Sequence, residues 1–317
     1  MTPTVPCGSL NMPMVGLGTW QATDEAELEE ALNVALQIGY RHIDTEAAFE
    51  NEHVIGKVLD QWISAGKLKR EDLFIVTKLP MRGIHRDRVE KYLTESLKKL
   101  GLDYVDLYLI HFPVGIAETE GSIVYEKEDH VEIWKSMEKQ VEAGRTKTIG
   151  LSNFTVSQID NILKNSKIKP SNNQVELHVF LQQPELVQFC QKNGISVTAC
   201  SPLGSPGMNT FLKKLGIKEK TLVKVLDNPV ILDIAKKHNK KSAQVALRFL
   251  LQQNIVVIPK SVNPERLKSN FDIFNFYLDD EDMTRLRGLE VGEDARMGDW
   301  KILPGLAEQP AYPFRRN

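Results

Sequence analysis

The chain has 317 residues, 42% of them hydrophobic and 26% charged, which is ordinary globular composition and excludes a disordered or fibrous protein. Its 40 lysine and arginine residues nearly balance 42 aspartate and glutamate residues, and a net charge of −2 excludes the strongly basic character of many nucleic-acid-binding proteins. No apolar stretch reaches the roughly 18 residues of a membrane span, and the first residues lack the layout of a secretory signal. We therefore expect neither nucleic acid nor a membrane among its partners.

The cysteine and histidine residues give no sign of a disulfide framework or a metal site. Cys7, Cys190 and Cys200 are odd in number and include no CxxC pair. The seven histidines show none of the close spacings of a catalytic zinc site. These features favour a reducing compartment, so we expect a cytoplasmic protein without a metal. Nothing in the sequence requires an oligomer, and we expect a monomer.

Eight short apolar or β-branched runs alternate along the chain with longer stretches of helical periodicity. Several runs are apolar throughout, which is typical of strands with both faces buried. In the longer stretches apolar residues recur on one helical face, as at Leu28, Leu32 and Leu36. The predicted strands are, in chain order, Val15–Thr19, His42–Thr45, Phe74–Leu79, Val105–His111, Thr148–Asn153, Asn173–Leu177, Ser196–Ser201 and Ile255–Lys260.

Alternating strands and helices predict an α/β fold with a parallel sheet. Eight such units within about 250 residues favour one closed (β/α)8 TIM barrel over a doubly wound open sheet, which usually has fewer strands. A single domain is expected over residues 1–317, with Gly8–Pro13 plugging the barrel bottom. Phe112–Val131 and Gly204–Asn228, after the fourth and seventh strands, are predicted as long binding loops or lids. The tail, Gly292–Asn317, is expected over the barrel mouth.

A polar or ionisable residue ends almost every predicted strand, and barrel active sites lie at these carboxyl ends. Asp44 and Lys78 end adjacent strands, where the carboxylate would keep the lysine charged. His111 ends the next strand and is suited to give a proton or a hydrogen bond to a carbonyl oxygen. A structural salt bridge and a satisfied core histidine would explain each residue alone. The three at consecutive strand ends favour a catalytic site.

A second group of residues follows the eighth strand. Asn263 is a good helix N-cap and Pro264 suits the first helical position, so a helix is predicted to begin there. Its N-terminus is flanked by Lys260, Ser261 and Arg266, which together are typical of a phosphate site. A surface helix cap with incidental basic residues is the alternative interpretation.

Six blocks of the sequence resemble the aldo-keto reductases, a family of (β/α)8 barrels that reduce aldehydes and ketones with NADPH. The blocks occur in the family's order between about Val15 and Asn270. The resemblance implies a carbonyl compound as substrate, NADPH/NADP⁺ as cofactor, and catalytic roles for Asp44, Lys78 and His111. The blocks are Val15–Trp20, Gly39–Thr45, Leu100–Leu107, Ile149–Phe154, Asn173–Glu176 and Ile258–Ser261.

The resemblance also implies where cofactor and substrate bind. Ser152, Asn153 and Gln174 would hold the nicotinamide carboxamide, and the residues after the eighth strand would hold the 2′-phosphate. The implied cofactor contacts are Thr19, Trp20, Asp44, Ser152, Asn153, Gln174, Cys200, Ser201, Leu203, Ser205, Lys260, Ser261, Asn263, Arg266, Ser269 and Asn270. The implied substrate pocket contains Trp20, Phe49, His111, Phe112 and Trp300.

Two residues depart from the family's pattern. The family's proton donor is a tyrosine five residues after the catalytic aspartate, a position that is Phe49 in this sequence. Because positioned acid catalysis contributes about 10²–10⁴-fold, simple aldehydes are expected to be reduced poorly. Cys200 stands where the family usually stacks a tyrosine under the nicotinamide ring, which predicts a weaker grip on that ring.

The hypothesis from sequence is therefore an NADPH-dependent carbonyl reductase that is impaired on simple aldehydes. His111 would supply a hydrogen bond to the developing oxyanion, or a water in place of the missing phenol would relay a proton from Lys78 or His111. Quinones, activated dicarbonyls or ketosteroids are candidate substrates. One alternative is a cofactor-binding pseudoenzyme, accessory protein or sensor. Another is a phosphate-binding aldolase or isomerase that uses Lys78 as a Schiff base, which a charged Asp44 beside the amine disfavours.

Overall fold

A computed structural model describes residues 2–119, 122–127 and 129–314. Its central feature is a parallel sheet of eight strands, each adjacent to its neighbours in the order β12–β11–β10–β9–β6–β5–β4–β3. Each strand overlaps one predicted from the sequence. The strands are β3 (Leu17–Gly18), β4 (His42–Asp44), β5 (Phe74–Leu79), β6 (Val105–Ile110), β9 (Thr146–Ser152), β10 (Asn172–Glu176), β11 (Ser196–Cys200) and β12 (Ile255–Val257).

The first and last strands of this sheet also meet, which closes it into a barrel. Parallel bridges join Val15 to Val257 and Gly18 to Lys260. The amide of Gly16 donates to the carbonyl of Val257 at 2.9 Å, and the amide of Val257 donates to Met14 at the same distance. The predicted (β/α)8 barrel is thus confirmed, and the doubly wound open sheet is excluded.

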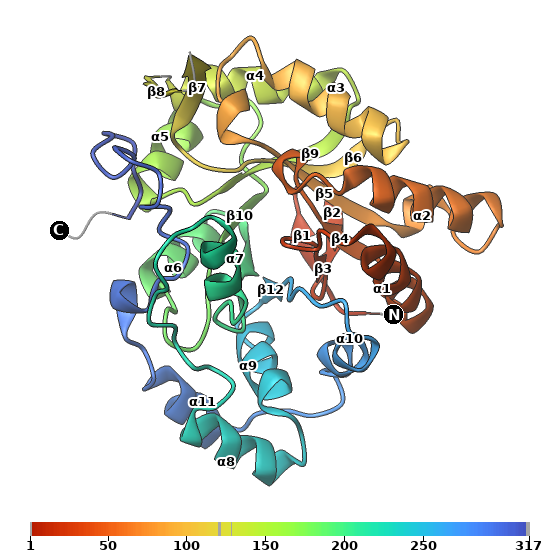
Figure 1. Ribbon diagram of the computed structural model, residues 1–317, viewed down its shortest axis with the longest axis vertical. Coiled ribbons are helices and arrows are strands. Elements are labelled where there is room, and N and C mark those ends of the chain that lie inside the picture. Colours follow the sequence, from red (N-terminus) through yellow and green to blue (C-terminus); the bar gives the residue numbers. More distant parts are fainter. Residues whose placement is uncertain (1, 120–121, 128, 315–317) are drawn as a thin grey trace.

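Helices surround the barrel and cover the outer faces of its strands (Figure 1). Every residue of β5 and β6 is buried, because barrel side chains cover one face and helices the other. No helix in the described part of the chain is long and apolar enough to cross a membrane. The helices are α1 (Glu25–Ile38), α2 (Glu52–Ser64), α3 (Val89–Leu100), α4 (His130–Glu142), α5 (Val156–Asn165), α6 (Pro184–Lys192), α7 (Met208–Lys214), α8 (Pro229–His238), α9 (Ser242–Leu251), α10 (Pro264–Phe271) and α11 (Asp280–Arg287), with short 3₁₀ turns η1 (Ala47–Phe49), η2 (Arg70–Asp72), η3 (Met81–Gly83) and η4 (Gly292–Ala295).

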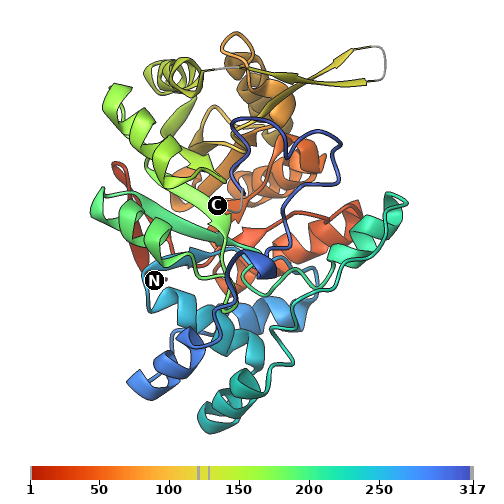
Figure 2. The ribbon, with the colours of Figure 1, turned by 90° about the vertical axis from the view of Figure 1, so that its left-hand side faces the viewer.

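An N-terminal hairpin lies at the end of the barrel where its strands begin (Figure 2). Strands β1 (Thr4–Cys7) and β2 (Leu10–Pro13) pair antiparallel, and Cys7 and Met12 are fully buried. A Cβ on Gly8 would stand 2.7 Å from the hydroxyl of Ser171, so the turn sits tightly against the barrel. Residues 8–13, the predicted plug, form the turn and second strand of this hairpin.

The two predicted long loops contain secondary structure that the sequence did not reveal. Between β6 and α4, strands β7 (Gly115–Thr119) and β8 (Ser122–Glu126) form an antiparallel hairpin. Arg88 holds this hairpin through two bonds to Glu126, and the hydroxyl of Tyr125 donates to Pro304 of the tail at 2.6 Å. After β11, the second predicted loop contains α7. These elements depend on contacts between distant parts of the chain, which local patterning does not report.

Barrel closure requires glycine at position 18. A Cβ there would lie 2.5 Å from the carbonyl oxygen of Ile258, a backbone atom without room to withdraw. We expect Gly18→Ala to lower the free energy of unfolding by about 1–3 kcal/mol, the usual cost of overpacking. Urea denaturation of the wild type and variant measures the difference.

Gly288→Ala is the matched control, because its added Cβ would come no nearer than 3.4 Å to another heavy atom and its φ of −65° suits alanine. A Gly18→Ala variant as stable as this control would contradict the closure argument.

Candidate active site

A cavity of about 600 Å³ opens at the carboxyl ends of the barrel strands. The structure brings together in its lining all but one of the predicted site residues. Those present are Thr19, Trp20, Asp44, Phe49, Lys78, His111, Ser152, Asn153, Gln174, Cys200, Ser201, Leu203, Ser205, Lys260, Ser261, Asn263, Arg266, Ser269, Asn270 and Trp300.

Phe112 is the exception, because its side chain does not line this cavity. The side chain is buried outside the cavity lining, in a separate apolar cluster with the tail. Its ring lies 6.4 Å from that of Tyr312 and 5.9 Å from that of Phe314, measured between centroids. Phe112 therefore anchors the tail over the barrel mouth. It faces away from His111, its neighbour in sequence, because successive side chains of an extended chain point to opposite sides.

A buried ion pair forms the centre of the site. The ammonium of Lys78 lies 2.6 Å from Oδ1 of Asp44 and donates to the carbonyl of Thr45 at 2.9 Å. Gln174 donates from Nε2 to the other carboxylate oxygen, Oδ2, at 2.7 Å. Both charged side chains are at most 3% exposed. A buried charge without a partner is destabilising, so the stability of Asp44 and Lys78 depends on their contacts with each other, with Thr45 and with Gln174.

The ring of Phe49 covers this ion pair. Phe49 ends the 3₁₀ turn η1 just after β4, and the Lys78 ammonium lies 5.3 Å from the centre of its ring. The Phe49 ring is also nearly perpendicular to the imidazole of His111, with centroids 6.5 Å apart. An aromatic face attracts the lysine cation, but it offers no proton. Lysine, phenyl ring and imidazole thus share one corner of the cavity with no hydroxyl on the ring.

His111 is held from two sides. Asn153, in the left-handed backbone region with φ 64°, donates from its side-chain amide to the His111 carbonyl at 2.9 Å. On the ring itself, Nδ1 lies 2.7 Å from Oε1 of Glu46. The backbone and one ring nitrogen are therefore engaged, and Nε2 is the ring nitrogen left for a ligand.

At the opposite end of the cavity, positive charge gathers at the N-terminus of α10. Asn263 caps the helix by accepting from the amide of Arg266 at 3.0 Å. Burial lowers the pKa of Lys260, and the positive charges of Arg266 and Lys214 lower it further against the opposing charge of Glu27. These positive charges repel one another, and a bound phosphate would relieve the repulsion. The free N–H groups at the helix N-terminus would also bind its oxygens. The residues present thus fit the phosphate of a dinucleotide.

The wall between these two ends is formed by the segment that follows β11. Burial raises the pKa of the Cys200 thiol to about 12, so at neutral pH the thiol is protonated and acts as a small apolar contact. Ser205 donates to Ser201 at 2.6 Å, and both residues have positive φ, which turns the chain back along the cavity. A flat ligand is thus offered a smooth wall rather than a reactive thiolate.

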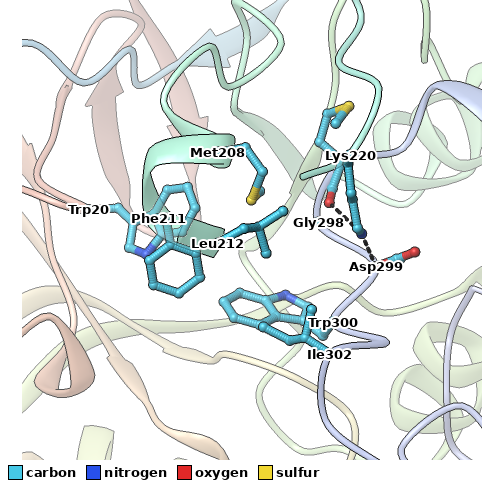
Figure 3. A pocket seen from close by; sticks show the side chains of 10 residues that line it. Trp20, Met208, Phe211, Leu212, Lys220, Gly298, Asp299, Trp300 and Ile302 are labelled. Carbon is cyan, nitrogen blue, oxygen red and sulfur yellow. Dashed lines mark hydrogen bonds and ion pairs between the residues drawn. The ribbon is translucent and has the colours of Figure 1, made fainter. Parts of the chain in front are cut away.

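Beside the cavity, α7 and the tail pack together around a smaller pocket, and Figure 3 shows the side chains that line it. The Trp20 ring contacts Phe211 of α7 and Trp300 of the tail, with centroid separations of 5.4 and 6.5 Å. Beside this aromatic group, the Lys220 ammonium lies 2.6 Å from the Asp299 carboxylate. The aromatic contacts and the ion pair together join two segments that are remote from each other in sequence.

Glu176, at the end of β10, fastens the tail from below. Its two carboxylate oxygens accept from the amides of Met297 and Gly298 at 2.8 and 2.7 Å. Burial by itself raises the pKa of Glu176, but the bond and charge of His178 and these two amides outweigh it and leave the pKa below its usual value. The carboxylate is therefore ionised at neutral pH and the tail is attached.

The sequence reasoning missed two buried carboxylates of this site, Glu46 and Glu176. Glu176 lies two positions after Gln174 on the same strand, and the twofold period of a strand places both on one face. Glu46 likewise lies two positions after Asp44, in extended backbone with φ −164°. The twofold spacing from a predicted site residue was the signal that could have found both.

Comparison with known proteins gives concordant results. The model of the aldo/keto reductase family matches residues 14–291. Aldo-keto reductase family 1 member A1-A of Danio rerio is 41% identical over 96% of this chain and 95% of its own length. Aldose reductase B of Dictyostelium discoideum is also 41% identical, over 88% of this chain and 89% of its own. The solved structure of the aldose reductase from Schistosoma japonicum superposes over 100% of both chains with a TM-score of 0.87 and 37% identity.

The tail attachment should depend on the ionised form of Glu176. A depressed carboxyl pKa contributes stability that is present above the unfolded pKa and is lost as pH falls through the folded pKa. Glu176→Gln leaves one tail amide without an acceptor, so we expect it to cost about 1–3 kcal/mol at neutral pH. The difference from wild type should shrink as the pH falls below about 4. Urea unfolding at several pH values and hydrogen exchange at Gly298 measure both effects.

Glu290→Gln is the control, because the Glu290 carboxylate accepts from Gln182 rather than from Met297 and Gly298. A Gly298 amide that exchanges equally slowly in Glu176→Gln and in this control would refute the attachment.

Proposed function

The chain belongs to the aldo/keto reductase family, and on this basis we propose that it reduces carbonyl compounds to alcohols with NADPH in preference to NADH. One observation carries the proposal. The cavity that contains Asp44, Lys78 and His111 at one end contains the cationic N-terminus of α10 at the other. A ligand with a reactive group at one end and a phosphate at the other matches this layout.

The polar side-chain atoms that other residues leave unused indicate which residues would hold the cofactor. Asn153 and Gln174 use their amide nitrogens on His111 and Asp44, which leaves their amide oxygens, with Ser152, for the nicotinamide carboxamide. Lys260, Ser261, Asn263 and Arg266 would bind the 2′-phosphate, with Ser269 and Asn270 beside adenine. When bound, the reduced nicotinamide supplies the hydride for the carbonyl carbon.

The remaining groups would receive the carbonyl substrate. Trp20, Phe49 and Trp300 give an apolar pocket, and His111 presents Nε2 to the carbonyl oxygen. The Lys78 ammonium bonds to Asp44 and Thr45, and the Phe49 ring lies against it without a hydroxyl to pass a proton. We therefore propose poor turnover of simple aldehydes and better turnover of quinones and activated dicarbonyls, whose reduced anions are stable without a strong acid.

We further propose a monomer that acts in the cytoplasm. All three cysteines are free thiols, with Cys7 and Cys190 fully buried, which suits a reducing compartment. The second candidate function is a cofactor-binding pseudoenzyme, and Phe49 is the observation that favours it.

Phe49→Tyr tests the lost proton donor. The new hydroxyl would lie beside the Lys78 ammonium, and we expect kcat for a simple aldehyde such as propanal to rise by about 10²-fold or more. Steady-state oxidation of NADPH measures the rate. The control is Phe211→Tyr, which adds a phenol on α7 away from Lys78. Equal rates for the two variants would contradict the proton-donor argument, and no turnover in either one would favour the pseudoenzyme.

Arg266→Ala tests the phosphate site independently of turnover. Loss of a charge-assisted contact of about 1.5–3 kcal/mol should weaken NADPH binding by roughly 10- to 100-fold and leave NADH binding nearly unchanged. Fluorescence titration of the purified protein gives both dissociation constants. Lys268→Ala is the matched control, because Lys268 is an exposed cation of the same helix outside the cavity. Equal weakening by both variants would show a general effect of charge and overturn the assignment.

A further inference from the structure

A buried carboxylate contacts the imidazole of the active site. Oε1 of Glu46 lies 2.7 Å from Nδ1 of His111, and the two side chains are 1% and 19% exposed. An imidazole nitrogen that faces a carboxylate oxygen at this distance carries the hydrogen, so Nδ1 is the donor. Nε2 then points to the substrate side of the ring. The contact therefore fixes which nitrogen of His111 serves the cavity.

The backbone holds Glu46 in place relative to Phe49. Glu46 precedes the 3₁₀ turn η1, and its carbonyl accepts from the amide of Phe49 at 3.0 Å. The phenyl ring and the carboxylate thus leave opposite ends of one tight turn, and both reach His111. The same turn that places a ring without a hydroxyl in the cavity also places an acid behind the imidazole.

The surroundings of Glu46 favour a positive partner. Its second oxygen, Oε2, is buried and has no hydrogen-bond partner among the described residues. Burial raises the pKa of neighbouring Glu52, and the charge of Glu46 raises it further. Burial and the charges of Glu52 and Glu46 also raise the pKa of Tyr108, so this hydroxyl stays protonated. Neither neighbour offers a cation, and a buried carboxylate is costly unless it is paired. Among the described residues, His111 is the group in contact with Glu46 that can become a cation.

We propose that Glu46 holds His111 as an imidazolium and thereby makes its Nε2–H the proton donor of carbonyl reduction, the task for which Phe49 has no hydroxyl. Glu46 acts as a positioning residue, and His111 as the catalytic residue. This inference rests on the proposed function.

The step balances as follows. The carbonyl carbon gains the hydride from the reduced cofactor, the C=O π bond breaks, and its electron pair takes the proton from Nε2 of His111. The products are the alcohol, the oxidised cofactor and a neutral imidazole, still bonded through Nδ1–H to the Glu46 carboxylate. A proton from solution then restores the imidazolium, so each turnover consumes one proton.

A double-mutant cycle between positions 46 and 49 separates this role from a structural one. Glu46→Gln keeps the shape and a hydrogen-bonding group but removes the charge. We expect it to lower kcat for propanal by about tenfold or more, with KM nearly unchanged. In the Phe49→Tyr background the phenol gives the proton, so the same substitution should cost less than about threefold. Glu52→Gln is the matched control, a buried carboxylate nearby that bonds to Thr77 instead of His111.

A measurement without cofactor examines the contact itself. In protein labelled with ¹⁵N-histidine, we expect the His111 ring to show both nitrogens protonated at neutral pH and a far-downfield Nδ1 proton. In Glu46→Gln the ring should lose its second proton, and in Glu52→Gln it should keep both. A His111 ring that carries one proton in the wild type at neutral pH would overturn the proposal.

The outcomes distinguish this inference from the proposed function. Suppose that the wild type turns over carbonyls. If Glu46→Gln then changes kcat equally with Phe and with Tyr at position 49, or changes it no more than Glu52→Gln does, Glu46 has no part in proton supply. In that case only this inference fails. If no variant turns over any carbonyl, the proposed function fails, and the role of Glu46 in the reaction fails with it. Loss of NADPH binding in Glu46→Gln, measured by fluorescence, would also overturn it, because it would show a disturbed cavity.

Discussion

The buried pair of Asp44 and Lys78 is the constraint around which this barrel is organised. Two charges with almost no access to solvent require partners on every side, and they obtain them from Thr45 and Gln174. These groups come from three strands or strand ends, so the barrel must close in one register for the pair to be satisfied. Asp44, Lys78 and Gln174 all line the cavity at the barrel mouth. The ion pair and the cavity are therefore parts of one structural feature.

The sequence predicts much of this arrangement, because its periodic and local signals are strong. Strands that are buried on both faces appear as apolar runs, and parallel topology brings the carboxyl ends of those runs to one face of the barrel. The sequence alone thus groups Asp44, Lys78 and His111. The start of α10 was likewise predicted from its N-cap Asn263 and from Pro264 at the first helical position.

What the sequence did not predict depends on contacts between remote segments. Glu46 meets His111 across 65 residues, and Glu176 meets Met297 across 121. A lone glutamate has no local pattern that distinguishes a buried ligand from a solvated side chain. Phe112 shows the converse, since the family resemblance implied a place in the substrate pocket, whereas its side chain packs in an apolar cluster with the tail. Tertiary packing decided these positions.

The division between barrel and tail bears on specificity. Barrel strands supply the ion pair and the imidazole, whereas Trp20 and Trp300 of the tail line the cavity above them, and Phe211 of α7 packs against Trp20. The tail is attached to the segment after α7 by the partly exposed ion pair of Lys220 with Asp299, and to β10 by the carboxylate of Glu176. An aromatic wall favours flat apolar substrates, because stacking adds to the burial of their surface. Such substrates often conjugate their carbonyls, and conjugation stabilises the oxyanion that forms on reduction. Under the proposed function, the aromatic tail and the missing phenol at Phe49 would thus select the same class of carbonyl compound.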